Sequence, residues 1–333
     1  MRIAVLGSGS WGSALAKVVS DNGHTTSLWG RRPELAEEIA TTRENKTFLP
    51  GIRFAETLSA TSDLGAALGG AEMVLVAIPT HGLREVMRAA EAMMPRGVPV
   101  VSATKGIEQN SLQFVNEVIA DELPFTAETF VALSGPSFAK EVAAGLPTVV
   151  VAASRDLALA EAVQRAWWTD ARFRVYLSDD VTGVEVGGAL KNVIAIAAGA
   201  SDGLGFGHNA RAALITRGLT EIARLAMKMG GDALTLAGLA GMGDLVLTCT
   251  GELSRNRHVG LELGRGRKLS EILGDMRQVA EGVRTAKSAY DLARREGVSM
   301  PIVEMVYEVL YLDRPIGEAV RWLMTRSAGH ERD

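Results

Sequence analysis

A lysine lies inside a strongly apolar helical stretch. Lys191 and the neighbouring Asn192 interrupt the run 187–198, in which every other residue is small or aliphatic. A lysine in such a helix must reach the surface with its long stem, pair with an anion or take part in chemistry. Burial favours the neutral amine and lowers its pKa, so Lys191 is suited to act as a general base. The alternative is a structural lysine that only extends to solvent.

Polar residues that could serve Lys191 or a ligand follow in two short stretches. Asp244 lies in the glycine-rich turn 241–245, where its carboxylate either orients Lys191 or caps a helix. The stretch 254–257, Ser-Arg-Asn-Arg, presents a compact set of hydrogen-bond donors, of which Arg257 is equally expected to be an ordinary surface residue. Such a set suits a phosphate, which it would hold by charge-assisted hydrogen bonds.

A second lysine follows a predicted strand. Lys105 comes directly after the apolar segment 99–104, at the carboxyl end of that strand. In open α/β sheets, ligands bind in the crevice outside the carboxyl ends of the strands. Lys105 is therefore expected to project into this crevice, and the alternative is a solvated loop lysine. The segment 130–134 is followed in the same way by a turn of small residues, where Ser137 either caps the next helix or helps to hold a ligand.

The segment 7–12, Gly-Ser-Gly-Ser-Trp-Gly, has the pattern and the context of a dinucleotide-binding loop. It follows the apolar strand 3–6 and leads into a predicted helix at 13–19. Gly7 permits the tight turn, Gly9 lets the backbone approach a pyrophosphate, and Gly12 lets helix and strand pack closely. The helix N-terminus offers free N–H groups and the positive end of its dipole to the phosphates. The alternative is a glycine-rich turn without a ligand.

The residues after the second predicted strand, 25–29, favour NADP(H), while NAD(H) stays possible. An NAD-binding site usually has an acidic residue here that accepts from the ribose 2′-hydroxyl. This chain has Arg31 and Arg32 instead. An arginine cannot accept from a hydroxyl, but its charge and forked donors suit a 2′-phosphate. The alternative is a solvated basic turn before the next helix.

The elements that must position these residues are of two kinds. Strands alternate with helices in the first part of the chain, and helices alone are expected in the second part. Apolar strands at 71–79, 99–104, 130–134, 148–153 and 173–177 alternate with helical segments, which predicts a doubly wound α/β sheet. The segment 45–51 is expected to be a loop with two apolar anchors. After about residue 178 the strand signals stop, and helices are expected from a cap at Asp179 or Asp180 to about 199, then at 210–229 and 302–312. A last helix is expected with Asp313 near its cap and Pro315 in its first turn.

We therefore predict an α/β N-terminal, Rossmann-like doubly wound sheet at 1–178 that binds the dinucleotide. An all-α C-terminal domain at 179–333 follows as the helical substrate and catalytic domain.

The net charge, the cysteine count and the distribution of apolar residues exclude several classes of protein. The net charge of −4 gives no electrostatic footprint for nucleic acid. The single cysteine, Cys249, excludes an intramolecular disulfide and fits a reducing compartment. The apolar helical stretch 184–200 carries three polar interruptions and is expected to be a buried core helix rather than a membrane span. With no signal peptide at the N-terminus, a cytoplasmic location is expected, and no metal site is predicted.

The chain resembles the bacterial-type NAD(P)-dependent sn-glycerol-3-phosphate dehydrogenases. The stretches that carry the resemblance span nearly the whole chain in order: 7–12, 45–51, Lys105-Gly106, 133–139, 188–209 with Leu190-Lys191-Asn192 and Asp202-Gly203-Leu204-Gly205, 241–245, 254–256 and Glu281-Gly282. One position departs from the pattern, because Gly251 stands where a serine is expected after Thr248-Cys249-Thr250. That difference puts a local loop contact in doubt.

The resemblance implies reduction of dihydroxyacetone phosphate to sn-glycerol 3-phosphate with NADPH or NADH, supplying phospholipid synthesis. It implies that Lys191 is the proton donor and acceptor. With Lys191, the substrate would be surrounded by Lys105, Gly135, Ser137, Asp244, Ser254, Arg255 and Asn256. Besides Gly7, Gly9 and Gly12, the cofactor would contact Ser10, Trp11, Arg31, Arg32, Lys105, Ala139, Arg255, Val279 and Glu281. Lys105 and Asp244 would act with Lys191 in catalysis, and a homodimer is an expectation at the level of the family.

Two other functions compete with this interpretation. The first is a different β-hydroxyacid-type dehydrogenase on the same architecture, whose substrate would carry a carboxylate in place of a phosphate. The second is a nucleotide-sensing protein that kept the sheet and lost the chemistry. The presence of Lys191, Asp244 and the donors at 254–256 argues against the second.

Overall fold

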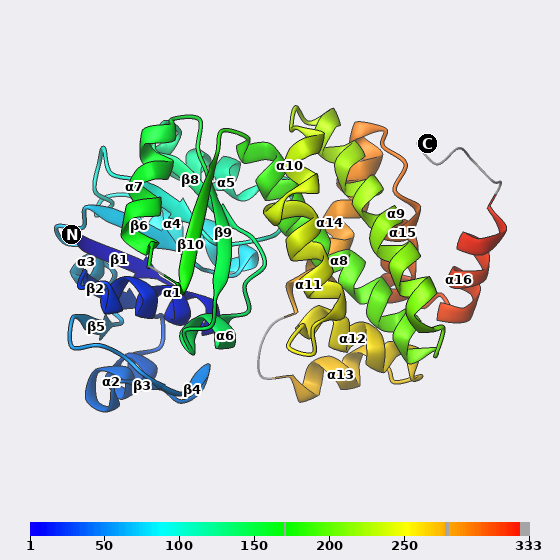
Figure 1. The fold of residues 1–333 in the computed structure, drawn as a ribbon, viewed down its shortest axis with the longest axis horizontal. Coiled ribbons are helices and arrows are strands. Elements are labelled where there is room, and N and C mark those ends of the chain that lie inside the picture. Colours follow the sequence, from blue (N-terminus) through cyan, green and yellow to red (C-terminus); the bar gives the residue numbers. More distant parts are fainter. Residues whose placement is uncertain (170, 277–279, 327–333) are drawn as a thin grey trace.

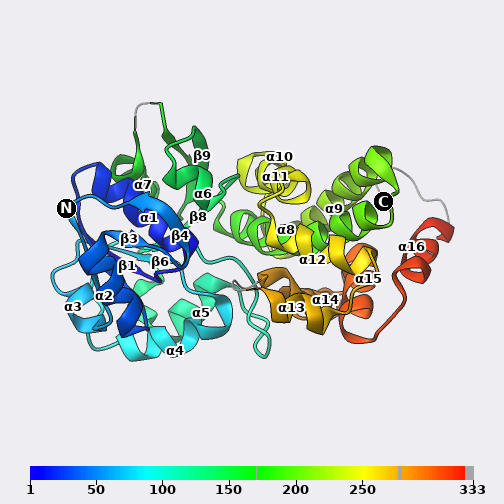
Figure 2. The same cartoon turned by 90° about the horizontal axis from the view of Figure 1, so that it is seen from below.

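The computed structural model describes residues 1–169, 171–276 and 280–326. An α/β half with the N-terminus lies at one end of the molecule, and a bundle of helices lies at the other (Figure 1). The view turned by 90° shows the same separation, with helix α8 leading from the sheet into the bundle (Figure 2). We propose that the domain boundary falls after residue 178, because strand β10 ends at Ser178 and α8 begins at Val181.

The α/β half is built on one eight-stranded sheet with the order β10-β9-β8-β7-β6-β1-β2-β5. Its strands are β1 (Arg2–Leu6), β2 (Thr25–Trp29), β5 (Leu58–Thr61), β6 (Met73–Val76), β7 (Val100–Ser102), β8 (Phe130–Ser134), β9 (Thr148–Ala153) and β10 (Phe173–Ser178). β1 lies between β2 and β6. The chain therefore adds β2 on one side of β1 and β6 on the other, and the direction in which strands are added reverses at β1. The glycine-rich loop that follows β1 therefore opens at the switch point where dinucleotides bind.

The sheet is not parallel throughout, which the sequence did not predict. β8 pairs with β9 in antiparallel register, while β9 and β10 are parallel to each other. The connection between β8 and β9 holds only the short helix α6 (Ala139–Ala143).

Alternate residues of the strands enter two separate cores, one on each face of the sheet. Ile3 and Val5 face the core under α1 (Ser10–Asp21), α6 and α7 (Leu157–Trp167). Ala4 and Leu6 face the core under α3 (Leu64–Leu68), α4 (Thr80–Ala90) and α5 (Val115–Glu122). Both faces of the sheet are thus covered by helices, which suits a strand such as β6 that is apolar without alternation and buried throughout.

The segment 45–51, expected to be a loop, is partly a hairpin. β3 (Glu44–Asn45) pairs with β4 (Leu49–Arg53) after α2 (Pro33–Thr42). The buried Asn45 side chain donates to the Ser8 carbonyl at 2.8 Å and to Oγ of Ser13 at 2.9 Å. Pairing over so few residues leaves no alternating pattern in the sequence, and the hairpin gains its support from these contacts to the glycine-rich loop.

The described residues of the second half form helices joined by turns, without a strand after Ser178. α8 (Val181–Gly203) is the central helix, and the Asp180 carboxylate caps it by accepting from the Gly183 N–H at 2.7 Å. Around it lie α9 (Gly207–Lys228), α10 (Ala233–Ala237), α11 (Asp244–Thr250), α12 (Arg255–Gly264), α13 (Leu269–Asp275), α14 (Glu281–Glu296), α15 (Pro301–Tyr311) and α16 (Ile316–Thr325). α8 and α12 approach so closely that a Cβ on Gly199 or Gly260 would overlap backbone atoms of the other helix.

α8 alone among the described helices is long and apolar enough to span a membrane by length and composition. In its most apolar window, 83% of the residues are buried among other parts of the fold, which marks it as a core helix. The last helix differs slightly from expectation, because Pro315 is the residue before α16 and not part of its first turn. Asp313, at φ 54°, turns the chain there and caps no helix.

Candidate active site

Two lysines from different halves of the chain share one buried carboxylate. Nζ of Lys105 donates to Oδ2 of Asp244 at 2.6 Å, and Nζ of Lys191 donates to Oδ1 of the same side chain. The Asp244 side chain is 1% exposed, and those of Lys191 and Lys105 are 10% and 16% exposed. The structure therefore brings together the three residues that the sequence predicted for catalysis. Asp244 caps no helix, because its carboxylate is occupied by the two ammonium groups.

Burial and the three charges set the protonation behaviour of this cluster. Burial lowers the pKa of Lys191 to about 7, the Lys105 ammonium also lowers it, and the Asp244 carboxylate acts to raise it. Burial acts to raise the pKa of Asp244, but Lys105 and Lys191 hold it below its usual value. The carboxylate thus stays ionised at neutral pH, while Lys191 can both give and take a proton there.

Three separate elements position the cluster. Lys191 lies in the middle of α8, and Gly188, one turn earlier, lies beside the stem of Lys105, which a Cβ would meet at 3.6 Å, an ordinary contact distance. Asp244 is the first residue of α11, which follows a π turn at Leu239–Gly243. π turns are uncommon and occur often at functional sites. Lys105 lies just beyond β7, at the carboxyl edge of the sheet.

The turn after β8 lies against the same region. Gly135 adopts φ +137°, and a Cβ there would come within 2.9 Å of the Val150 backbone. The Ser137 hydroxyl donates to the Gly135 carbonyl at 2.9 Å, and no side-chain bond caps α6. Ser137 therefore stabilises its own turn, and the helix-capping alternative is wrong. A Cβ added to Gly243, next to Asp244, would lie 3.6 Å from the Pro136 ring.

The residues at 254–256 have three different roles in the structure. Oγ of Ser254 caps α12 by accepting from the Arg257 N–H at 3.2 Å. The buried Asn256 donates to Oδ1 of Asn192 and accepts from the Gly282 N–H, both at 2.9 Å, and so links α8 to α14. Arg255 is exposed at the first position of α12. Of the three side chains, Arg255 is thus the one open to an anionic ligand.

Glu281 connects the two halves at the first position of α14. Burial raises the pKa of Glu281 to about 7, although the guanidinium groups of Arg255 and Arg284 and a hydrogen bond from the Thr80 backbone N–H all act to lower it. Thr80 begins α4 in the sheet half. Arg284 was not predictable from the sequence, because it lies among many polar residues of α14. Val279, also predicted to contact the cofactor, lies outside the described residues.

The glycine-rich loop has the shape that a dinucleotide requires. Gly7 has φ +122° and Gly12 packs on it, so that a Cβ on either would overlap a carbonyl group, of Ala77 and of Gly7 respectively. Nothing lies within 4 Å of where a Cβ on Gly9 would be, so the loop is open at that point. Gly9 directly precedes α1, whose first N–H groups are free for phosphate oxygens. The residues present thus fit the cofactor predicted for them.

The other predicted cofactor residues surround this loop. Oγ of Ser10 donates to the Phe48 carbonyl at 2.8 Å, which holds the hairpin beside the loop. The buried indole N–H of Trp11 has no hydrogen-bond partner among the residues that the structure describes. Arg31 and Arg32 are exposed between β2 and α2, and the Arg32 guanidinium lies 5.1 Å from the centre of the Phe48 ring. Ala139 begins α6 and packs against the core beside α1.

Comparison with known proteins assigns the chain to a family. A model of the NAD-dependent glycerol-3-phosphate dehydrogenase N-terminus matches residues 2–160, and a model of the C-terminus of the same family matches residues 180–321. The chain belongs to the NAD-dependent glycerol-3-phosphate dehydrogenase family. The names of its relatives carry the cofactor label NAD(P)+.

Relatives of this glycerol-3-phosphate dehydrogenase family cover the chain from end to end. A protein from Geobacter sp. (strain M21), named glycerol-3-phosphate dehydrogenase (NAD(P)+), is 56% identical over 98% of this chain and 97% of its own. A protein of the same name from Myxococcus xanthus is 54% identical over 99% of both chains. The crystal structure of glycerol-3-phosphate dehydrogenase from Coxiella burnetii covers 98% of this chain and 99% of its own, with a TM-score of 0.93 and 41% identity. The predicted fold class and family are confirmed.

The structure explains the glycine that departs from the family pattern. Gly251 ends α11, and a Cβ there would come within 2.5 Å of the Phe138 ring and 2.8 Å of the Leu247 carbonyl. The Phe138 ring comes from the turn after β8, in the other half of the chain. Gly251 therefore accommodates a contact between the two halves that a serine would disturb.

Proposed function

We propose that this chain reduces dihydroxyacetone phosphate to sn-glycerol 3-phosphate with NADPH or NADH and so supplies glycerophospholipid synthesis. The observation that carries this proposal is the buried cluster of Lys191, Asp244 and Lys105 at the carboxyl edge of a dinucleotide-binding sheet. The cluster joins a group that can exchange a proton near neutral pH to a second positive charge. A ketone reduction needs both, in addition to a hydride.

The nicotinamide, when bound, supplies the hydride for the ketone carbon. The protein has to orient that ketone and deliver one proton to its oxygen. Protonated Lys191 gives its proton to the oxygen as negative charge develops there, and the side chain is left as a neutral amine. In the reverse direction neutral Lys191 removes the proton from the 2-hydroxyl group. The ammonium of Lys105 stabilises the negative charge on the oxygen in both directions.

Asp244 has a positioning role in this mechanism. Its carboxylate accepts from both ammonium groups through different oxygens, which fixes the distance between them. Its charge also makes Lys191 a weaker acid than burial beside Lys105 alone would make it. Without it, Lys191 would lose its proton at a lower pH, and less of the protonated donor would be present at neutral pH.

Arg255 is our candidate anchor for the substrate phosphate. Arg255 is an exposed residue at the N-terminus of α12, where free backbone N–H groups and the helix dipole also favour an anion. Ser254 and Asn256 would support this site mainly by fixing the helix start and its distance from Lys191 in α8. Binding the phosphate away from the reacting carbon would orient the ketone toward the lysine cluster.

NADPH is the favoured cofactor in this proposal. Arg31 and Arg32 follow β2 at the position where a 2′-phosphate would lie, and both are exposed. The remaining predicted contacts, from Ser10 and Trp11 to Ala139 and Glu281, would hold the rest of the dinucleotide. NADH would bind through the same glycine-rich loop but without the charge pairing.

Steady-state kinetics with two matched ketones test the substrate assignment. Dihydroxyacetone phosphate should be turned over with NADPH, while unphosphorylated dihydroxyacetone should give almost no turnover. Arg255→Gln should reduce this preference, whereas Arg265→Gln, at the other end of α12, should leave it unchanged. Equal rates with both ketones, or turnover only with carboxylate-bearing substrates, would contradict the assignment and favour a β-hydroxyacid-type enzyme.

A cytoplasmic location and a homodimer also belong to the proposal. The location is supported by Cys249, which is buried and unpaired as expected in a reducing compartment. Cell fractionation would test the location, and light scattering of the purified protein would test the dimer.

A further inference from the structure

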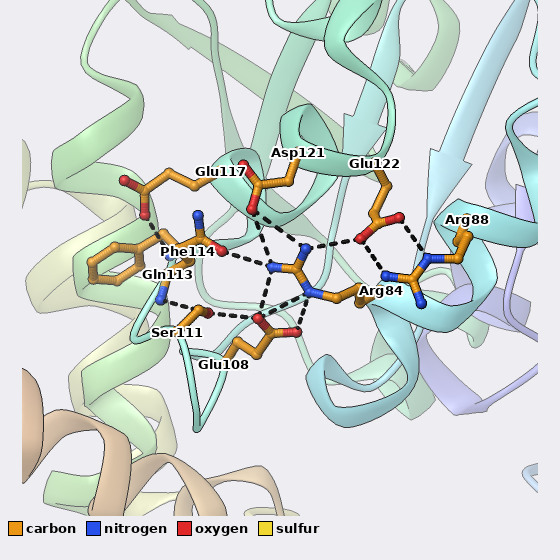
Figure 3. Close-up of polar contacts among 9 residues, drawn as sticks. All are labelled: Arg84, Arg88, Glu108, Ser111, Gln113, Phe114, Glu117, Asp121 and Glu122. Atoms are coloured by element: carbon orange, nitrogen blue, oxygen red, sulfur yellow. Dashed lines mark hydrogen bonds and ion pairs between the residues drawn. The ribbon is translucent and has the colours of Figure 1, made fainter.

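The guanidinium of Arg84 is surrounded by acidic and amide side chains from two segments (Figure 3). Nε and Nη2 donate to Glu108 at 2.8–3.1 Å, and Nη2 also donates to Gln113 at 2.7 Å. Nη1 donates to Glu122 at 2.9 Å, and both Nη atoms lie 3.3 Å from Asp121. Arg84 comes from α4, and its partners come from α5 and from the loop 103–114. Arg84 therefore ties three segments together.

The loop 103–114 is the segment that carries Lys105. It has no helix or strand of its own, and it closes on itself where the Glu108 N–H donates to the Gln113 carbonyl at 2.9 Å. The Ser111 hydroxyl also donates to the Glu108 carboxylate. Glu108 is thus the centre of the loop, and Arg84 holds it with a two-pronged arginine–carboxylate contact. Such contacts fix direction as well as distance.

The same face of α4 holds the other end of this segment. Thr80 lies one turn before Arg84, so the two side chains project on the same side of the helix. Oγ1 of Thr80 donates to the Lys105 carbonyl at 3.4 Å. Gly106 packs so closely on Thr80 that a Cβ would come within 2.5 Å of that hydroxyl. One face of α4 therefore contacts the loop at two points three residues apart. Thr80 contacts Lys105, and Arg84 contacts Glu108.

The far end of the loop is tied to the helix that carries Lys191. The Asn116 N–H, in the first turn of α5, donates to Oε1 of Glu185 in α8 at 3.0 Å. Glu117 closes the same turn by accepting from the Phe114 N–H at 2.8 Å. The loop is thus held against α4 on one side and against α8 on the other.

We propose that Arg84 is a positioning residue for Lys105, acting by holding the loop 103–114 against α4. The inference rests on the role of Lys105 in the proposed function. Lys105 reaches Asp244 at 2.6 Å from a loop that contains no strand or helix of its own. A displacement of about 1 Å at a reacting group can cost on the order of 100-fold in rate. Replacing Arg84 would leave Glu108, Asp121 and Glu122 close together, and their repulsion would open the loop.

Arg88 provides the matched control. It lies one turn further along α4 and also pairs with Glu122, through Nε and Nη2 at 2.9 Å. Its side chain is 67% exposed, against 26% for Arg84, and it has no hydrogen bond to the loop. Like Arg84→Met, Arg88→Met removes one positive charge from α4 and one ion pair to Glu122. It leaves the contacts of Arg84 to Glu108 and Gln113 in place.

A double-mutant cycle tests the proposal. Arg84→Met should lower kcat/KM for dihydroxyacetone phosphate by about 10- to 100-fold, while Arg88→Met should leave it near the wild-type value. In a Lys105→Met background, Arg84→Met should have almost no further effect, because the group it positions is gone. Independent, multiplicative losses in the cycle would overturn the proposal. If Arg84→Met does not fold, the same cycle with Arg84→Lys, which keeps the charge and loses the fork, decides the question.

Hydrogen–deuterium exchange separates this inference from the proposed function. Exchange in residues 104–114 should become faster in Arg84→Met and stay unchanged in Arg88→Met. Unchanged exchange in both variants would overturn the positioning role, whatever the kinetics show. Faster exchange together with normal turnover of Lys105→Met would instead contradict the proposed role of Lys105 in catalysis, and with it the positioning of a catalytic group by Arg84.

Discussion

Lys191 and Asp244 form a buried ion pair although 53 positions separate them in the chain. The pair joins the middle of α8 to the first residue of α11, and Lys105 completes it from the sheet half. Because the carboxylate has one oxygen for each lysine, a change at any of the three side chains alters the charge that the other two experience.

Lys191→Ala should separate chemistry from binding. We expect kcat to fall by about 10²–10⁴-fold, because the proton donor is removed. The affinity for NADPH, measured by its fluorescence, should change little. Added methylamine should restore part of the activity, and the surface variant Lys287→Ala should behave as wild type. Near-normal turnover of Lys191→Ala would remove this residue from the mechanism.

The two directions of the reaction should depend on pH in opposite ways. Reduction needs protonated Lys191, whose pKa burial lowers to about 7, so kcat/KM should fall as the pH rises through that value. Oxidation needs the neutral amine and should rise over the same range. Asp244→Asn removes the charge that raises this pKa, so the falling limb of reduction should move to lower pH. A limb that stays in place in Asp244→Asn would show that another group titrates.

The arginine pair after β2 should select the cofactor. Arg31→Ala together with Arg32→Ala should weaken NADPH binding much more than NADH binding, because only NADPH carries the 2′-phosphate. Arg53→Ala, on the exposed side of β4, serves as the control and should affect neither. Fluorescence titrations of both cofactors measure the effect, and equal weakening of both would mean that the arginines do not contact the phosphate.

Gly251→Ser should destabilise the protein although serine is the residue that the family pattern leads one to expect. The added Cβ would meet the Phe138 ring at 2.5 Å, and overpacking of this kind costs about 1–3 kcal/mol. Phe138→Leu should cancel part of that cost in the double variant. Urea unfolding of the four proteins measures this coupling, and purely additive changes would show that the ring is not the obstacle.

Glu185→Gln should stabilise the protein increasingly as the pH rises. Burial raises the pKa of Glu185 to about 8 from an ordinary value of 4.5. Between these values the unfolded chain releases a proton that the folded protein retains, so the free energy of unfolding of the wild type decreases with pH. The amide of the variant does not titrate, so the advantage of Glu185→Gln over the wild type should grow between about pH 5 and pH 8. Urea unfolding at three pH values tests this, with Glu161→Gln as the exposed control. An advantage that stays constant with pH would show that Glu185 does not retain its proton in the folded protein.

Much of the fold follows from local patterns. The strand, glycine-rich loop and first helix were predictable because each glycine answers a backbone requirement in its own neighbourhood. The helical second half was predictable from its periodicity, and the start of α8 from its capping aspartate. The hairpin of β3 and β4 and the antiparallel β8–β9 pair were not, because both depend on which segments meet and not on what either segment prefers.

The features of the candidate site also divide into those that the sequence indicated and those that only the tertiary structure set. The sequence by itself determined that Lys191 lies in an apolar helix, that Lys105 follows a strand and that Asp244 lies in a glycine-rich turn. It could not show that Ser254 caps α12 and that Asn256 links α8 to α14. The phosphate contacts predicted for both side chains stay a prediction. Only the tertiary structure decided that Asp244 accepts from both lysines. The physical reason is distance along the chain: short-range patterns set periodicity and caps, while contacts across 139 and 53 positions arise from how closely glycine-lined helices and the sheet pack.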